Sequence, residues 1–491
     1  MKPQVRLDLP GLQMGSDWQV QEMDWAIPGG AHSAILSAYI QNPTQINSEM
    51  VTAWLAKAVE ICNPVGEVLW HGWIEAVSLE YERLRLRWDC SQMINRVIAR
   101  YPTVSALLDP YRSWTYSSWV EDQAGVDRLG AREKLLTLEH ADASSALQAA
   151  TNHLNSKSKT SGTQIKLLEK HTKPRLVLHA SGWWQRLDWT LDGEESGMLA
   201  HLPGGKSQQA FGLSGIERLA QRFQVGGTAF ALGQICLRAA LIGAPADQVR
   251  VLICADNAAR PGTVLATASL PNYVLHGGWQ WLTWLLDTAL NLSAGSFAWL
   301  VVERSAGLDS SNHYVLESDD GRGYPDGELR CWNGSDWILL NQDLRFCLLA
   351  VTETTGLMRE VAERAVQGGV LQGVQIWKDS GVQIPRWRTL EKTRRAALEK
   401  WLSYGCADGS ELSALINPAG ILEVFPLPRL AELPLQLGLD GRLHLPAGTA
   451  LPPAIDLLGR RLLLPRAQRE EEGILQGLRW TVEGGLLPVM G

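Results

Sequence analysis

Residues 249–266 read VRVLICADNAARPGTVLA, in which two apolar runs flank a short segment rich in Asn, Ala, Pro and Gly. Branched apolar side chains favour extended backbone, whereas Pro and Gly favour a turn. The stretch therefore predicts two strands, Gln248–Ala255 and Thr263–Leu270, joined by a tight turn.

The same pattern continues on both sides of this hairpin, from Gly205 to Val351. Short apolar runs recur there with Gly, Asn or Asp turns between them, and helical periodicity is lacking. About eight to ten strands at regular spacing, without a helix long enough for a crossover, predict an antiparallel β-sandwich or jelly roll.

The segments on either side, Met1–His201 and Thr352–Gly491, have a different character. Both combine β patterns with short helices, so the fold class expected for the chain is mainly β, and α+β overall. In the first segment we expect helices at Met50–Cys62 and Asp142–Leu154 and strands at Glu80–Trp88, Arg175–His179 and Trp183–Leu191. In the second, a helix through Met358–Val366 and another beginning near Thr389 are followed by strands and loops.

Composition bounds the function classes. At roughly 150 residues per domain, 491 residues predict about three folding units. The net charge is −7 and the densest basic run, Arg386–Lys400, has helical spacing, so no nucleic-acid surface is expected. The start of the chain lacks an apolar signal segment, which favours synthesis in the cytoplasm.

Neither membrane spans nor disulfides are expected. The two most apolar stretches, Ala229–Pro245 and Trp279–Val302, are interrupted by charged or polar residues. Seven scattered cysteines without a C-x-x-C pair favour reduced, buried thiols over disulfides or a zinc site.

Motifs for catalysis and cofactors are incomplete. The string Gly204-Gly205-Lys206-Ser207 lacks the first glycine of a phosphate-binding loop, and Gly212-Leu213-Ser214-Gly215 has its second glycine one place early for a nucleophile elbow. The ten histidines show no metal-binding pair at helical spacing. We therefore expect no catalytic residue and no cofactor.

Carboxylates leave an alternative open, because glycoside hydrolysis needs only two of them. The candidates are Asp256, Glu303, Asp319, Asp320, Asp326 and Asp336. Asp before Gly, as in Asp320-Gly321 and Asp326-Gly327, is typical of hairpin turns, so turns are the more frequent explanation. Calcium binding by Asp319, Asp320 and Asp326 is a weaker alternative.

Aromatic residues offer candidate contact surfaces, since the chain contains 21 Trp. Indole rings fill sandwich cores, and they also stack on sugars or line protein interfaces. Core packing is the more frequent explanation for the set Trp279, Trp281, Trp284, Trp299, Tyr314, Tyr324, Trp332 and Trp337. The candidates for glycan or partner binding are Trp279, Trp281, Tyr324, Trp332 and Trp337.

The run of residues 249–266 resembles the choice-of-anchor class of jelly-roll domains, found in phage tail and bacterial surface proteins. Its flanks agree with that class: Gln221-Arg222-Phe223-Gln224-Val225 upstream, and Phe297-Ala298-Trp299-Leu300-Val301-Val302 and Asp343-Leu344-Arg345-Phe346 downstream. The resemblance covers nearly the whole of residues 205–351 and implies a jelly-roll module.

The outer segments resemble tail-hub or tail-tip proteins of tailed phages. The resemblance is carried by residues 25–34 (WAIPGGAHSA), 72–77 (GWIEAV) and 95–101 (NRVIARY), followed after the sandwich by the two helices and by residues 439–443 (LDGRL). It implies a hub-like body made of residues 1–201 and 352–491, split by an inserted sandwich at 205–351. The insertion departs from the family pattern.

Such proteins lie at the distal end of a tail tube, commonly as trimers, and organise the baseplate or fibres. The resemblance therefore implies a non-enzymatic virion protein whose partners are other tail, baseplate or fibre subunits, with host-surface glycan as a further possible ligand. The alternative is a glycan-degrading tail enzyme with carboxylates near Asp319, Asp320 or Asp336. A bacterial surface adhesin is a third class, but it requires an export signal.

Overall fold

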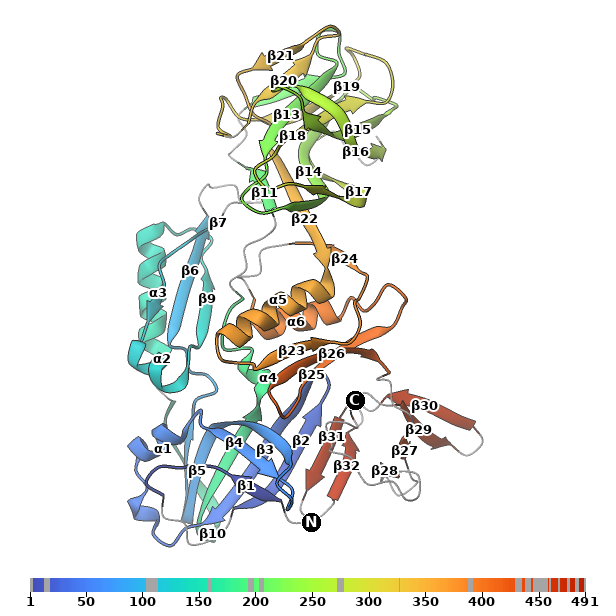
Figure 1. Ribbon diagram of the computed structural model, residues 1–491. Helices are drawn as coiled ribbons and strands as arrows, with labels where there is room; N and C mark the ends of the chain where they lie inside the picture. Colours follow the sequence, from blue (N-terminus) through green and yellow to red (C-terminus); the bar gives the residue numbers. More distant parts are fainter. Residues whose placement is uncertain are drawn as a thin grey trace.

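The computed structural model describes residues 3–12, 18–102, 114–157, 161–192, 198–202, 207–271, 278–325, 327–386, 392–428, 435–437, 443–444, 458, 461–466, 469–474, 477–481 and 485–489. The molecule is elongated, with a β-sandwich at one end, a large sheet at the other and two helices between them (Figure 1). Strands dominate every part, which confirms the predicted fold class, mainly β with short helices.

The sandwich consists of two antiparallel sheets that face one another. The seven-stranded sheet has the order β11-β22-β14-β19-β12, with β17 also on β14 and β24 on β22; the six-stranded sheet has the order β16-β15-β18-β13-β20-β21. The strands are β11 (Met198–His201), β12 (Ser207–Phe211), β13 (Arg218–Gln224), β14 (Phe230–Ile242), β15 (Gln248–Asp256), β16 (Pro261–Pro271), β17 (Gln280–Leu292), β18 (Phe297–Arg304), β19 (His313–Ser318), β20 (Leu329–Trp332), β21 (Trp337–Leu340), β22 (Phe346–Glu353) and β24 (Gln383–Pro385).

One apolar core fills the space between these sheets. Alternate residues of the facing strands are fully buried, among them Phe223 on β13, Ile235 on β14 and Phe346 on β22. Because side chains alternate across a strand, each sheet sends one set inward and the other outward. The turn between β15 and β16 contains Ala258 and Ala259 in the left-handed region, with φ of 50° and 60°.

The large sheet joins strands from both sides of the sandwich. Its order is β1-β4-β5-β10-β3-β2-β31-β32, with β25 beside β3 and β26, and β26 beside β23. The bounds are β1 (Gln4–Arg6), β2 (Gln19–Ala26), β3 (Gly29–Tyr39), β4 (Ala58–Cys62), β5 (Val68–Asp89), β10 (Ser161–Gly182), β23 (Gly373–Ile376), β25 (Glu411–Ile416), β26 (Ile421–Leu427), β31 (Gly477–Thr481) and β32 (Gly485–Val489). We call the described residues of 3–192 and 354–489 the body; β24 belongs to it and pairs with the end of β22.

The core of the body is shared in the same way. Trp54, Trp70 and Trp73 from the first segment pack in one cluster with Phe425 and Leu478 from the last. All of these side chains are fully or almost fully buried. Burial of such large apolar groups is the main source of stability, so the body core depends on residues separated by the whole sandwich.

Two helices cover the part of the sheet nearest the sandwich. They are α5 (Thr354–Gln367) and α6 (Arg394–Leu402), and α4 (Trp183–Arg186) packs beside them (Figure 1). Thr393 caps α6, because its hydroxyl oxygen accepts a hydrogen bond from the Ala396 amide. The predicted start near Thr389 lies outside the described residues.

A smaller lobe lies beside these helices (Figure 1). It pairs β6 (Arg96–Pro102) with β7 (Trp114–Tyr116), β8 (Val120–Glu121) and β9 (Glu133–Thr137), with α2 (Gln123–Leu129) and α3 (Ala143–Lys157) alongside. Near the C-terminus, β27 (Leu435–Leu437), β28 (Leu443–His444), β29 (Arg461–Arg466) and β30 (Arg469–Ile474) form a further sheet.

Two expected elements of the first segment were wrong. The helix predicted at Met50–Cys62 is only α1 (Ser48–Trp54), and Ala58–Cys62 is instead strand β4 between β1 and β5. The strand predicted at Trp183–Leu191 begins as the short helix α4. In the first case, sheet pairing overrides a local pattern that suits a helix, because Val59 and Ile61 alternate into the core.

The sandwich joins the body through neighbouring strands. Met198–His201 of β11 pairs with Phe346–Leu349 of β22, and Val351–Glu353 of β22 then pairs with β24. Strand β22 therefore runs from the sandwich into the body (Figure 1). Within the described residues, no helix is long and apolar enough to cross a membrane.

Candidate functional site

The aromatic residues predicted to bind a glycan or partner lie in three separate places on the sandwich. Trp281 belongs to the seven-stranded sheet and Trp279 directly precedes its strand β17. Trp332 and Trp337 belong to the edge of the six-stranded sheet, and Tyr324 to the loop between β19 and β20. Trp284, three residues after Trp281, lies in the sandwich core. The structure therefore places the candidates as two pairs and the single residue Tyr324, and not as one platform.

Trp281 lies on the outer face of the seven-stranded sheet, beside a charged network. The Arg345 guanidinium is 5.4 Å from the centroid of the Trp281 ring. Glu317 accepts hydrogen bonds from Arg345 at 2.9 Å and from Arg238 at 3.1 Å. Trp279, just before β17, is 38% exposed. We call these residues the Trp281 face; it combines indole surface with fixed charged donors.

Trp332 and Trp337 pair across the β20–β21 hairpin. Their ring centroids are 5.5 Å apart, and both side chains are half-buried. An ion pair of 2.9 Å between Arg260 and Asp336 connects this hairpin to the β15–β16 turn. Asp336, a candidate carboxylate of the enzyme alternative, therefore forms an ion pair with the Arg260 side chain.

The β15–β16 turn is itself held by a second carboxylate. Asp256 accepts two hydrogen bonds from Arg222, at 2.9 and 3.1 Å, and one from the Trp299 indole at 2.7 Å. Burial opposes ionisation, but these donors outweigh it and lower the pKa of Asp256. Glu303 is likewise bound by two arginines, Arg218 and Arg250. Both residues have a structural role in the sheet.

Asp319 belongs to a buried cluster that the sequence pattern did not reveal. His201 Nε2 lies 2.7 Å from Asp319 Oδ2, and the Asp343 amide donates to Asp319 Oδ1 at 2.9 Å. His201 is 118 residues away in sequence, so only the pairing of β11 with β22 brings it here. Tyr324 lies over the cluster, with its ring centroid 5.7 Å from that of His201.

His201, Asp319 and Asp343 are suitable in type for a metal, since one ligand atom from each lies within 4.8 Å of the others. The carboxylate oxygens already accept hydrogen bonds, however. Asp319 accepts from the amides of Gly321 and Gly323, and Asp343 accepts from the Tyr324 amide and the Gln221 side chain. These protein donors hold the loop around the cluster in place.

The remaining calcium candidates are not part of this cluster. Asp320 is exposed beside it, and Asp326 lies outside the described residues. Burial, reinforced by the neighbouring charge of Asp319, raises the pKa of Asp343 in spite of its hydrogen bonds. Asp319 and Asp343 each serve as a hydrogen-bond acceptor within the loop, which gives both carboxyl groups a structural role there.

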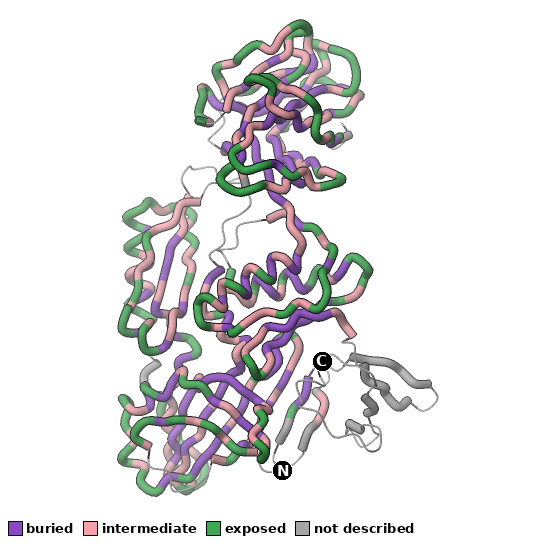
Figure 2. The backbone as a smooth tube through the Cα atoms, viewed as in Figure 1, coloured by how far each residue is buried: buried purple, intermediate pink, exposed green. Residues whose placement is uncertain are grey.

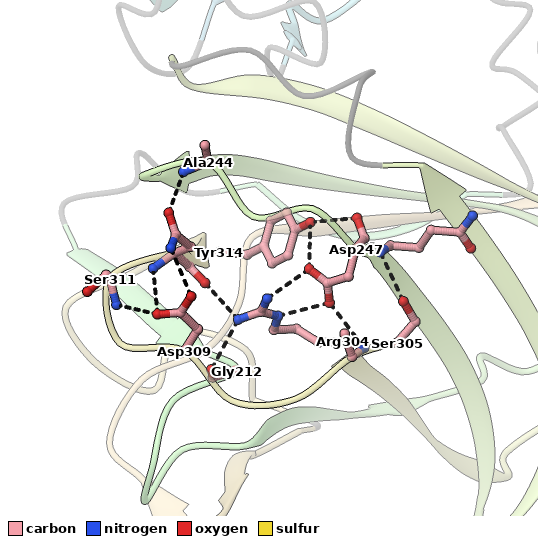
Figure 3. A network of polar contacts seen from close by, with 11 residues as sticks. Gly212, Ala244, Asp247, Arg304, Ser305, Asp309, Ser311 and Tyr314 are labelled. Atoms are coloured by element: carbon pink, nitrogen blue, oxygen red, sulfur yellow. Dashed lines mark hydrogen bonds and ion pairs between the residues drawn. The ribbon is translucent and has the colours of Figure 1, made fainter.

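A second polar network closes the sandwich where three loops meet. Arg304 donates two hydrogen bonds to Asp247, both of 2.9 Å, and one of 2.7 Å to the Asn312 carbonyl oxygen. Tyr314 donates its hydroxyl to the Asp247 carbonyl oxygen at 3.0 Å, and Asp309 orders the turn before β19 (Figure 3). Arg304 and Asp247 are both nearly buried. This network is structural, since every charge in it has a partner.

Comparisons with known proteins add little to this geometry. No protein-family model and no curated protein matches the chain. Among solved structures, the chain is similar to the clostridial cysteine protease Cwp84, with 11% identity, 67% of this chain and 70% of that chain covered, and a TM-score of 0.24.

A second solved structure is a glycoside hydrolase family 43 arabinoxylan arabinofuranohydrolase from Bacillus subtilis, with 10% identity, 58% of this chain and 63% of that chain covered, and a TM-score of 0.16. Scores this low carry no argument about fold or function for this protein. The sequence and the geometry remain the basis for its function.

Proposed function

We propose that this chain is a non-enzymatic structural protein of a phage tail tip or baseplate, in which the body assembles with other subunits and the sandwich makes an outward contact. The observation that carries the proposal is that the body and the sandwich have separate sheets and separate cores. Strands from both ends of the chain share one sheet, while the sandwich has its own core and is attached by β11 and β22.

This arrangement suits display. A module with its own core can protrude without disturbing the domain that carries it, because few contacts cross the boundary. The sandwich lies at one end of the elongated molecule, and its buried positions form a group separate from those of the body (Figure 2). The resemblance of residues 25–34, 72–77 and 95–101 to tail-hub proteins supports assembly as the task of the body.

The Trp281 face is the proposed contact surface. Indole rings beside charged hydrogen-bonding groups are typical of protein interfaces and of sugar recognition. Arg345, Glu317 and Arg238 hold one another in place, so the face is ordered before a ligand arrives. Its ligand is a neighbouring baseplate or fibre subunit or a host-surface glycan.

Mass measurement of the full-length protein tests the assembly role. We expect a homo-oligomer, with a trimer as the expected state, in native mass spectrometry and sedimentation. A monomer that persists at high micromolar concentration, and that binds no tail or baseplate subunit, would count decisively against the proposal.

A glycan array followed by a reducing-end assay tests the contact role and the enzyme alternative together. If glycan is the ligand, we expect binding without release of reducing ends, and Trp281→Ala should abolish it. Trp332→Ala, on the opposite sheet, is the matched control and should bind normally. Reducing-end release that disappears in Asp320→Ala would replace the structural role by a glycosidase.

A further inference from the structure

The body contains a basic cavity that the proposed function does not use. It has a volume of about 690 Å³ and lies between the small lobe, the residues after α4, and helices α5 and α6. Its charged lining residues are Arg96, Arg186, Arg364, Arg394 and Glu133. A cavity of this size accepts a ligand as large as a sugar phosphate.

Two of the four arginines are neutralised by protein carboxylates. Arg96 donates to Glu133 at 2.6 Å, and Arg364 donates two hydrogen bonds to Asp192, at 2.8 and 3.0 Å. Asp192 is fully buried, so this pair is fixed in place. These contacts form part of the cavity wall. They do not involve the guanidinium groups of the other two arginines, Arg186 and Arg394.

Arg186 and Arg394 have no carboxylate partner among the described residues. The Nε atom of each is buried without a hydrogen-bond acceptor. Arg186 lies against two indole rings, at 4.8 Å from the Trp183 centroid and 5.2 Å from that of Trp189. Burial lowers the pKa of both guanidinium groups, which reflects the cost of holding a cation there.

Two further carboxylates contact the paired arginines, since Glu121 lies 3.0 Å from Arg96 and Glu360 lies 3.8 Å from Arg364. Arg132 adds a positive charge near Arg186. Trp189 is contacted on its ring by Arg132 as well, at 4.0 Å from the centroid, and Arg132 hydrogen-bonds to Cys90 instead of to a carboxylate. Glu133 also accepts from the Leu191 amide at 2.8 Å, so its second oxygen is occupied. The carboxylates near the cavity therefore contact Arg96 and Arg364, whereas Arg186 and Arg394 are lining cations without an ion pair among the described residues.

We propose that this cavity binds a dianionic oxyanion of the phosphate or phosphate-monoester class, with Arg186 and Arg394 as its charged donors. A phosphate group carries close to two negative charges at neutral pH and offers several acceptor oxygens. Guanidinium groups match such oxygens with paired N–H donors. A single carboxylate would leave one of the two cations unpaired.

Calorimetric titration of the full-length protein at low salt tests this proposal, with inorganic phosphate and glucose 6-phosphate as probes. We expect saturable binding of both, at least about tenfold weaker in Arg186→Gln and in Arg394→Gln. Arg260→Gln, an exposed arginine on the sandwich, is the matched control and should leave the affinity unchanged. Tighter binding of glucose 6-phosphate would identify a sugar phosphate as the ligand, and equal binding would identify the phosphate group itself.

Several outcomes would overturn the proposal. They are the lack of saturable binding at millimolar phosphate, tighter binding of glucuronate than of either phosphate probe, and unchanged affinity in both cavity variants. Thermal unfolding without ligand gives a second reading. Because Arg186 has no carboxylate partner and loses only its contacts with the Trp183 and Trp189 rings, Arg186→Gln should change the unfolding temperature little. A marked fall together with unchanged phosphate affinity would assign Arg186 a purely structural role.

Discussion

The body and the sandwich bury their apolar cores with strands drawn from the chain in opposite ways. The sandwich buries its core with strands that follow one another closely along the chain, from β12 to β22. The body buries its core with strands from both ends, so that Phe425 and Leu478 complete a cluster begun by Trp54 and Trp70. The difference teaches that a module can be inserted into a sheet protein when the interrupted strands still meet.

Separate expression of the two parts should have the largest effect. Residues 198–351 alone should fold and unfold cooperatively, because both sheets, apart from the short edge strand β24, and their core are present. Residues 1–192 alone should not fold, because β25, β26, β31 and β32 are missing from their sheet. Circular dichroism and amide dispersion in NMR measure both outcomes. A native-like fold of residues 1–192 would break the comparison.

Two matched core substitutions should separate the domains energetically. Phe425→Ala and Phe346→Ala each empty a fully buried site, which typically costs about 3–5 kcal/mol. Phe425 is in the body core and Phe346 in the sandwich core. Hydrogen exchange read by mass spectrometry should show lost protection only in the domain that carries the change. Loss in both domains would mean that they unfold as one unit.

Acid should weaken the body before the sandwich. Burial of His71 lowers its pKa from 6.5 to about 4, so the unfolded chain takes up a proton there before the native state does. Stability is therefore lost as the pH falls between those values, by about 3 kcal/mol. The body variant His71→Gln should show a flatter pH dependence in urea unfolding.

The sandwich provides the contrast for that experiment. Burial opposes ionisation of Asp247, but its hydrogen bonds with Arg304 outweigh burial and lower its pKa. A depressed carboxyl pKa contributes stability that is lost only as the pH falls below the unfolded value, about 4. If hydrogen-exchange protection of the sandwich fell together with that of the body between pH 6.5 and 4, the body would not be the first part to lose stability in acid, and the prediction would be wrong.

The smallest expected effect is local to the network of Figure 3. Gly212 has φ of +81°, and a Cβ atom there would overlap the Arg304 side chain that binds Asp247. Gly212→Ala should cost the sandwich at least about 2 kcal/mol. Gly215→Ala, with φ of +82° and nothing near the new atom, should cost only about 1 kcal/mol. Equal losses of unfolding free energy in the two variants, measured by denaturant unfolding, would show that the Arg304 side chain can move away from the added Cβ atom.

Local patterns were most informative within the sandwich. The hairpin predicted from Gln248–Ala255 and Thr263–Leu270 is β15 and β16 in the structure. Ser207–Phe211 has a mostly polar sequence with little β signal, and its pairing with β19 makes it a strand. The same long-range effect converts Ala58–Cys62 from an expected helix to β4.

The candidate site was less accessible to sequence reasoning. Asp319 was identified as a turn or calcium residue, but its partners His201 and Asp343 come from strand or loop positions that only the sheet brings together. Arg394 belongs to the basic run Arg386–Lys400, but nothing in the sequence connects it with Arg186, which lies in a different segment on the other side of the sandwich. Predicting either group of residues would have required knowing which strands and helices lie side by side.

The sequence by itself determined the fold class, because alternation of apolar side chains and turn residues acts over a few neighbouring positions. The hairpin of residues 249–266 is such a local feature, and it is β15 and β16 in the structure. Only the tertiary structure decided which charges meet and which remain without a carboxylate, since that depends on the packing of segments far apart in the chain. Burial then gives those charges their energetic weight.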